Sequence, residues 1–251
     1  MINTKVKLLW YFFLSCMKFM IKYIKHITIL LFLHLVFSFD GQAQTLTDLK
    51  YFGLKGKVKK QVTTYYTNII EDSGEWYIKD SNSNYSITRT FDKEGLLSET
   101  IQKGINTDNR RIYTIKNSRK TENFFYSKGK QTNYSKYIYT DSSMIEKEYT
   151  LNGKLSMKIS SFFDKNLIVT SEEIKNYKED QTLDSDIKTI FDNDSDGFST
   201  CFVKLDMLTR KEDVYTLNFI KRDETGNSIK ALKLINNNPY AIQITSYEYY
   251  Y

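Results

Sequence analysis

Short alternating stretches of apolar and polar residues, separated by polar turns, run through the chain after Gly53 and constrain its fold more than any other feature. In one of them Tyr215, Leu217 and Phe219 fall on one face of an extended strand, with polar residues between them. Period-two alternation gives a strand one apolar face and one face for water, as antiparallel sheets allow. The strongest turn signal is Asn152-Gly153, because both residues tolerate the positive φ of tight hairpins. The pattern therefore predicts antiparallel β-hairpins.

The turns share a frame in which an aromatic residue ends one strand, a polar turn follows, and an apolar residue starts the next. The frame recurs at 91–97, 149–155 and 191–198. Its irregular spacing gives a degenerate repeat, and any antiparallel meander would also produce such turns. We expect an all-β fold, an antiparallel meander of β-hairpins forming one twisted, elongated or curled sheet. A short helix over 47–52, capped by Thr47 or Asp48, precedes it.

Residues 1–43 have the organisation of a leader with a secretory signal peptide. A lysine-containing flank precedes the apolar run 27–39, and Gly41-Gln42-Ala43 places small residues at the −3 and −1 positions of a cut after Ala43. The run is shorter than the about 20 apolar residues of a bilayer span, and an uncleaved membrane anchor is the alternative. Translation is expected to start at Met17 or Met20. We therefore expect one exported domain, residues 44–251, in the periplasm, on the outer-membrane surface or outside the cell.

Removal of this leader changes the chemical inventory of the chain. Both of its 2 histidines, His26 and His34, and one of its 2 cysteines, Cys16, lie in residues 1–43. The net charge of +6 also belongs mostly to the leader, so it does not indicate the concentrated basic face that nucleic-acid binding requires. The remaining Cys201 cannot form an internal disulfide and is expected to be a half-buried strand cysteine.

The expected mature chain is poorly equipped for catalysis. Histidine is the usual general base near neutral pH, and a nucleophilic serine or cysteine normally needs such a base beside it. Carboxylates are what remains, and pairs such as Glu146 with Glu148 and Glu172 with Glu173 are more typical of solvated strands and loops than of a glycosidase cleft. We expect no enzyme, with a carboxylate-based glycan hydrolase as the alternative.

One turn resembles half of a calcium loop. Asp192, Asp194 and Asp196 alternate before Gly197, as in the opening of an EF-hand loop, but Val203 occupies the twelfth position where a bidentate Glu belongs. The flanks also read as strands. We expect a polar hairpin turn and at best weak calcium binding, and no other cofactor.

Aromatic residues are the remaining candidates for ligand contact. Trp76 is the only tryptophan after the leader and follows a turn, while Tyr137 and Tyr139 belong to a tyrosine-rich stretch. Such residues can stack on sugars or peptides, although cross-strand aromatic pairs that hold a sheet are the commoner role.

The hairpin units resemble those of known families. The Phe-Asp-x-x-Gly units are similar to YD-repeat (Rhs-type) units, and the segment 149–155 resembles the MORN-like units of the YwqK-type antitoxin family. The segment 53–59, Gly-Leu-Lys-Gly-Lys-Val-Lys, resembles uncharacterised secreted proteins of Bacteroidota-type bacteria. The resemblance implies a long meander of hairpins and brings no catalytic residues.

These observations favour a non-enzymatic binding or structural module of the cell envelope. Its partner is expected to be an envelope protein or glycan and not a nucleic acid, and the mature chain is expected to lack a membrane span. An immunity-type protein that neutralises a toxin partner is a further alternative, by analogy alone. The sequence does not identify the ligand or the oligomeric state.

Overall fold

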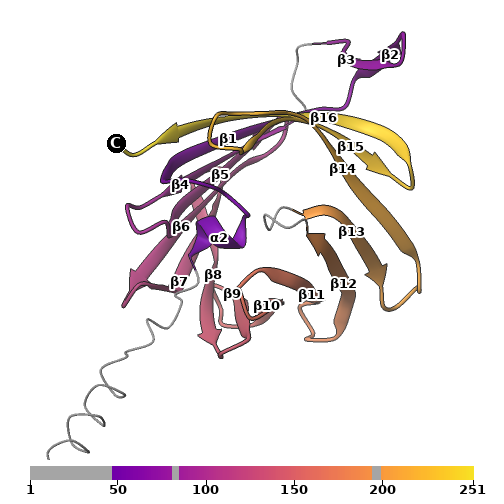
Figure 1. Ribbon diagram of the computed structural model, residues 1–251. Helices are drawn as coiled ribbons and strands as arrows, with labels where there is room; N and C mark the ends of the chain where they lie inside the picture. Colours follow the sequence, from indigo (N-terminus) through magenta and orange to yellow (C-terminus); the bar gives the residue numbers. More distant parts are fainter. Residues whose placement is uncertain (1–46, 81–84, 194–198) are drawn as a thin grey trace, which may run out of the picture. The chain divides into compact units, whose positions relative to one another are not determined.

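The computed structural model describes residues 47–80, 85–193 and 199–251, and within these ranges fourteen strands form a closed antiparallel barrel (Figure 1). Each strand pairs with its neighbour in the chain except around β1, which pairs with both β4 and β16 and so closes the ring. The barrel strands are β1 (Val58–Tyr66), β4 (Tyr85–Phe91), β5 (Leu97–Gly104), β6 (Asp108–Lys116), β7 (Arg119–Ser127), β8 (Lys130–Tyr139), β9 (Ser143–Thr150), β10 (Leu155–Phe163), β11 (Val169–Tyr177), β12 (Leu183–Asn193), β13 (Ser199–Asp206), β14 (Glu212–Arg222), β15 (Ser228–Ile235) and β16 (Asn238–Tyr249).

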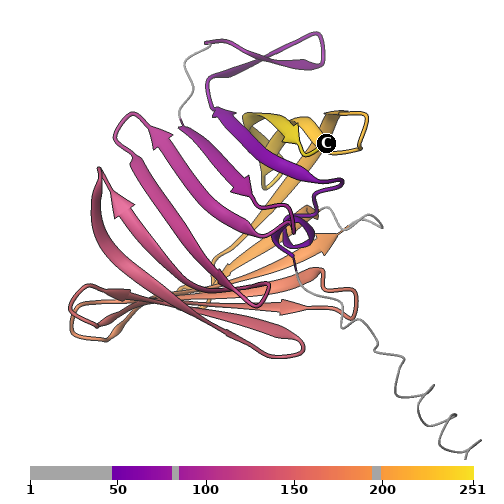
Figure 2. The same ribbon diagram turned by 90° about the vertical axis from the view of Figure 1, so that its left-hand side faces the viewer.

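A small hairpin interrupts the barrel order between β1 and β4. Strands β2 (Ile69–Asp72) and β3 (Glu75–Ile78) pair only with each other in the described residues and form a two-stranded sheet. Figure 2 shows this hairpin projecting beyond the barrel strands. Its packing contacts are with β16.

The closed ring corrects the expected architecture. The all-β class is confirmed, but the expectation of one twisted, elongated or curled sheet is wrong because that sheet would leave β1 and β16 with open edges. Pairing of Val62 with Ser246 and of Tyr65 with Gln243 satisfies both edges. Closure removes the unpaired backbone groups that make an edge strand a site of aggregation.

The local strand patterns agree with the expected alternation. Tyr215, Leu217 and Phe219 occupy alternate positions of β14 opposite Ile235, Lys233 and Ala231 of β15. Arg89, which breaks the apolar pattern of its strand, does not mark an edge, since β4 pairs on both sides. Its guanidinium carbon instead lies 4.6 Å from the ring centre of Phe52, so the long side chain covers an aromatic ring.

The predicted turn at Asn152-Gly153 is present with a different geometry. Gly153 has a φ of 82°, as expected. Its N–H donates to the carbonyl of Thr150 at 2.9 Å, and the Thr150 N–H donates to the carbonyl of Lys154 at 2.9 Å. The loop therefore contains three residues, Leu151 to Gly153, which is the turn-plus-bulge hairpin with glycine in the left-handed position and not a two-residue turn.

A single short helix, α2 (Asp48–Tyr51), is described before the barrel, where the sequence predicted one. The Thr47 hydroxyl accepts a hydrogen bond from the Lys50 N–H at 3.3 Å and so caps the helix. Gly53 follows with a φ of 63°, in the left-handed conformation that ends helices. None of the helices within the described residues is long and apolar enough to cross a membrane.

The helix lies within the ring of strands at one end of the barrel (Figure 1). A buried cluster of Val58, Phe91 and Leu97 packs there against Leu49 and Phe52. Gly95 permits this approach, because a Cβ atom on it would lie 2.8 Å from Leu49 Cδ1 and its φ is 83°. A buried apolar cluster thus lies at the helix end, where the chain enters the barrel.

Candidate functional site

A buried ion pair fixes α2 to the inner wall. Asp48 Oδ1 lies 2.6 Å from Lys120 Nζ on β7, and the other carboxylate oxygen accepts the Leu97 N–H at 2.7 Å. Burial by itself lowers the pKa of Lys120, but Asp48, together with Tyr113 and Tyr139, outweighs burial and raises the pKa above the ordinary lysine value. The inner wall therefore holds a buried ion pair at the start of the helix.

Tyr51 extends this anchoring to the opposite strands. Its hydroxyl donates to Glu172 Oε1 on β11, which also accepts from the Ser161 hydroxyl of β10 at 3.1 Å. Burial and the charge of Glu172 raise the pKa of Tyr51 well above its ordinary value. The phenol consequently remains protonated and holds Glu172 in place as a hydrogen-bond donor.

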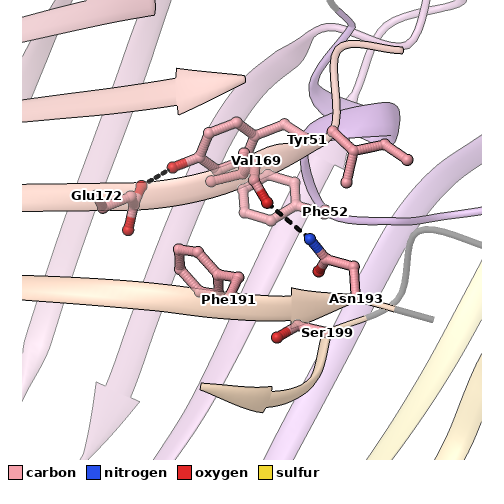
Figure 3. Close-up of a pocket in the computed structure, with 8 residues that line it drawn as sticks. Tyr51, Phe52, Val169, Glu172, Phe191, Asn193 and Ser199 are labelled. Atoms are coloured by element: carbon pink, nitrogen blue, oxygen red, sulfur yellow. Dashed lines mark hydrogen bonds between the residues drawn. The ribbon is translucent and has the colours of Figure 1, made fainter. Parts of the chain in front are cut away.

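A cavity of about 330 Å³ lies beside the helix within these contacts. The residues around it come from α2 and its C-cap, from β11 and the residue before it, and from β12 and β13 (Figure 3). They are Tyr51, Phe52, Ile168, Val169, Glu172, Phe191, Asn193 and Ser199. The Asn193 amide donates to the Val169 carbonyl at 2.8 Å. The volume and the mixture of apolar walls with a few fixed polar groups are those of a small-molecule site.

A second polar cluster covers the inner wall of β6 to β9. Arg111 places its two terminal nitrogens 3.0 Å from Glu146 and 2.8 Å from Glu148, and both carboxylates are buried. Asn123 and Ser135 donate to Glu146 at 2.9 and 2.8 Å, which further satisfies its charge. Although burial by itself lowers the pKa of Arg111, the two glutamates raise it above the ordinary value. The cluster is an ion network in which both carboxylates are paired, while the buried Asn123 Oδ1 has no hydrogen-bond partner.

The pleat of the strands places the two carboxylate pairs singled out in the sequence differently. Glu146 and Glu148 share the inner face and one arginine, whereas the adjacent Glu172 and Glu173 point to opposite faces of β11. In the described part of the chain no group of three or more His, Cys, Asp or Glu side chains is arranged to hold a metal ion.

The predicted ligand-contact residues do not form one site. Trp76 lies in the β2–β3 hairpin, opposite Glu71, while Tyr137 and Tyr139 lie on β8 of the barrel with ring centres 6.5 Å apart. Tyr137 accepts a hydrogen bond from the Asn123 amide at 2.6 Å, and burial raises its pKa well above the ordinary value. These two tyrosines support the polar network of the inner wall.

The predicted calcium turn is only partly within the described chain. Asp192 is an exposed residue of β12 that pairs with Cys201 of β13, and Asp194 and Asp196 lie outside the described residues. The flanking segments are strands, as expected. Cys201 is a half-buried strand cysteine, also as expected. The leader, with its cut after Ala43, likewise lies outside the described residues.

Of the residues that line the cavity, the sequence singled out Glu172 alone, and only as one of a pair typical of solvated strands. Glu172 lies on the inner face of β11 with Ile174 and Asn176, at every second position of the strand. Tyr51 and Phe191 read as ordinary aromatic residues next to turns. Only the ring closure and the insertion of α2 bring these three strands and the helix together.

Comparisons with known proteins do not assign the chain to a family. No family model and no curated protein matches the chain. A porin-like protein from Bacteroides vulgatus is 9% identical, with a TM-score of 0.46, and covers 76% of this chain and 98% of its own. A porin-like protein from Bacteroides uniformis is 10% identical, with a TM-score of 0.43, and covers 77% of this chain and 98% of its own. The comparisons give no support to the YD-repeat and MORN-like resemblances.

Proposed function

We propose that the mature chain is a non-enzymatic, exported binding protein of the cell envelope that holds a small ligand inside its barrel. The cavity beside α2 is the observation that carries this proposal. Eight strands already give a barrel whose interior side chains just fill, so fourteen enclose a lumen that side chains leave partly open. Phe52 and Phe191 offer apolar surface to a ligand, and Glu172 and Asn193 offer polar atoms.

Charged residues on the outer wall support the proposal that water surrounds the barrel. Six charged side chains follow one another across the middle of β7 to β12 through directly paired positions: Glu122, Lys136, Lys147, Lys158, Lys175 and Asp186. Lys136 follows Ser135 and precedes Tyr137, which face inward, so this row faces outward. A lysine facing lipid at the bilayer midplane costs about 2–4 kcal/mol. A lipid-facing wall is therefore a poor fit to this half of the barrel.

The carboxylates argue against the hydrolase alternative. A glycosidase needs two carboxyl groups facing a substrate, one of them free to carry a proton. Glu146 and Glu148 instead form ion pairs with the same Arg111, and Glu172 stands alone in the cavity with Tyr51 bound to it. The arrangement is suited to holding a ligand and lacks a second catalytic group.

Two measurements test this proposal. The envelope form should begin at Gln44, within a residue or two, and should leave the envelope on washing with high salt or alkaline carbonate without detergent. A form that requires detergent for release would refute the water-facing barrel. A full-length chain that retains residues 27–39 would refute export with cleavage.

Ligand binding is tested by filling the cavity. Ser199 lines it, so Ser199→Trp should abolish binding to mono- and oligosaccharides on a glycan array, whereas Ile190→Trp, on the outer face of the neighbouring β12, should not. Loss of binding in both variants, or in neither, would contradict a site beside α2. Far-UV circular dichroism and thermal unfolding would verify that both variants are folded.

A further inference from the structure

Two lysines that form no ion pair with the described residues project into the lumen from β13 and β15. Lys204 Nζ lies 5.0 Å from the ring centre of Tyr215, and Lys233 Nζ lies 4.7 Å from that of Tyr65. The register places both on the inner face. Lys204 is paired with Thr189, which is paired with the inward-facing Glu172. Lys233 is paired with Leu217, which shares a face of β14 with Tyr215.

Aromatic rings form the walls around these amines. Tyr65 stacks on Tyr85 with ring centres 4.4 Å apart, and Phe202 stacks on Tyr215 at 4.7 Å. Tyr240 completes the set, since its ring centre is 5.9 Å from Lys233 Nζ. Each tyrosine combines a flat apolar face with a hydroxyl that can donate or accept a hydrogen bond.

The charges at this place are unbalanced. Asp213 pairs with Lys204 across β13 and β14, but its carboxylate accepts from Lys211 at 3.0 Å and from Asn236 at 3.0 Å. Burial, and then the positive charge of Lys204, lower the pKa of Lys233 to about 8. A half-buried ammonium that faces a like charge is destabilising by itself, and an anion placed between the two amines would relieve that repulsion.

We propose that Lys204 and Lys233, together with the rings of Tyr65, Tyr215 and Tyr240, bind the carboxylate and the ring of an acidic sugar such as a uronic acid. The two ammonium groups hold the carboxylate, the ring faces cover the apolar face of the sugar, and the phenol groups bind its hydroxyls. This inference rests on the proposed function, because the lumen must admit a ligand.

The site adjoins the cavity beside α2 at β12 and β13, where the ring centres of Phe191 and Phe202 are 6.0 Å apart, and extends away from the helix along β4. Phe91 ends β4 and packs with Phe52 of the helix, whereas Tyr85 begins β4 and stacks on Tyr65 beside Lys233. The two groups therefore lie toward opposite ends of the same strand.

Calorimetric titration of the purified protein with trigalacturonic acid tests the proposal, with neutral trigalactose and sodium acetate as comparison probes. We expect trigalacturonic acid to bind, and Lys233→Met to weaken it about 10- to 100-fold, the range for loss of a hydrogen bond to a charged group. Lys233→Arg should retain most of the affinity. Lys188→Met, on the exposed outer side of β12, removes the same charge and should change nothing.

Folding does not confound this test, because Lys233→Met removes an unpaired half-buried charge and should unfold at the same temperature as the unaltered protein or higher. Equal affinity in Lys233→Met would overturn the site, as would equal binding of trigalactose. Acetate that binds as tightly as trigalacturonic acid would mean an adventitious anion only. Absence of trigalacturonic acid binding together with glycan binding that Ser199→Trp abolishes would overturn this inference and leave the proposed function standing.

Discussion

Removal of the amine that anchors α2 should be among the most destabilising single substitutions in the inner wall. Lys120→Met keeps the length of the side chain but leaves Asp48, whose side chain is 5% exposed, with the Leu97 N–H as its described donor. Breaking one partner of a buried ion pair costs about 3–5 kcal/mol, mostly because the remaining charge is uncompensated. For a domain of this size that loss lowers the melting temperature by about 6–20 °C.

Thermal and urea unfolding at pH 7, followed by far-UV circular dichroism, would measure this loss. The double variant Asp48→Asn with Lys120→Met should recover part of it, since no charge is then buried alone. Lys221→Met, an exposed lysine of β14, is the matched control and should stay within about 0.5 kcal/mol of the unaltered protein. A loss below about 1 kcal/mol for Lys120→Met would show that α2 is not held by this pair.

Three further substitutions test other parts of the fold. Gly153→Val should cost about 1–3 kcal/mol in urea unfolding because the glycine has a φ of 82°, although no atom lies within 4 Å of the added Cβ; a neutral result would contradict the left-handed turn. Arg111→Met should cost about 3–5 kcal/mol in the same assay by stranding Glu146 and Glu148, and a smaller cost should follow if both glutamates become glutamine. Lys233→Met should stabilise the protein by up to about 3 kcal/mol at pH 7. The pKa of Lys233 is about 8 in the folded protein and 10.5 in the unfolded chain, so the unaltered protein gains stability as the pH rises from 8 to 10. The stability advantage of Lys233→Met should therefore shrink over that window. An advantage that is constant with pH would refute the reasoning.

Local structure was predictable from the sequence, because it depends on neighbours in the chain. The alternation of Tyr215, Leu217 and Phe219 and the positive φ of Gly153 both express contacts within a few residues. The capping of α2 by Thr47 is of the same kind. Such features need no knowledge of the ring.

Closure and the candidate sites were not predictable, because they depend on residues far apart in the chain. Nothing in the alternation of β1 indicates that Val58 pairs with Tyr249. The contact between Tyr51 and Glu172 exists only because the ring places β11 opposite the helix. An inward-facing Lys233 and an outward-facing lysine are also indistinguishable until the register is known.

The pairing of β1 with β16 also determines when the barrel can form. The first and last barrel strands share one ladder, so the ring stays open until the final strand is available, and β1 and β15 each present an unpaired edge until then. Contacts between such distant segments form slowly, because the entropy of loop closure is lost before they contribute. Pairing of β16 with both β15 and β1 is therefore expected to limit the folding rate. Under the proposed export, this order would leave the ring open until the last strand has crossed the membrane.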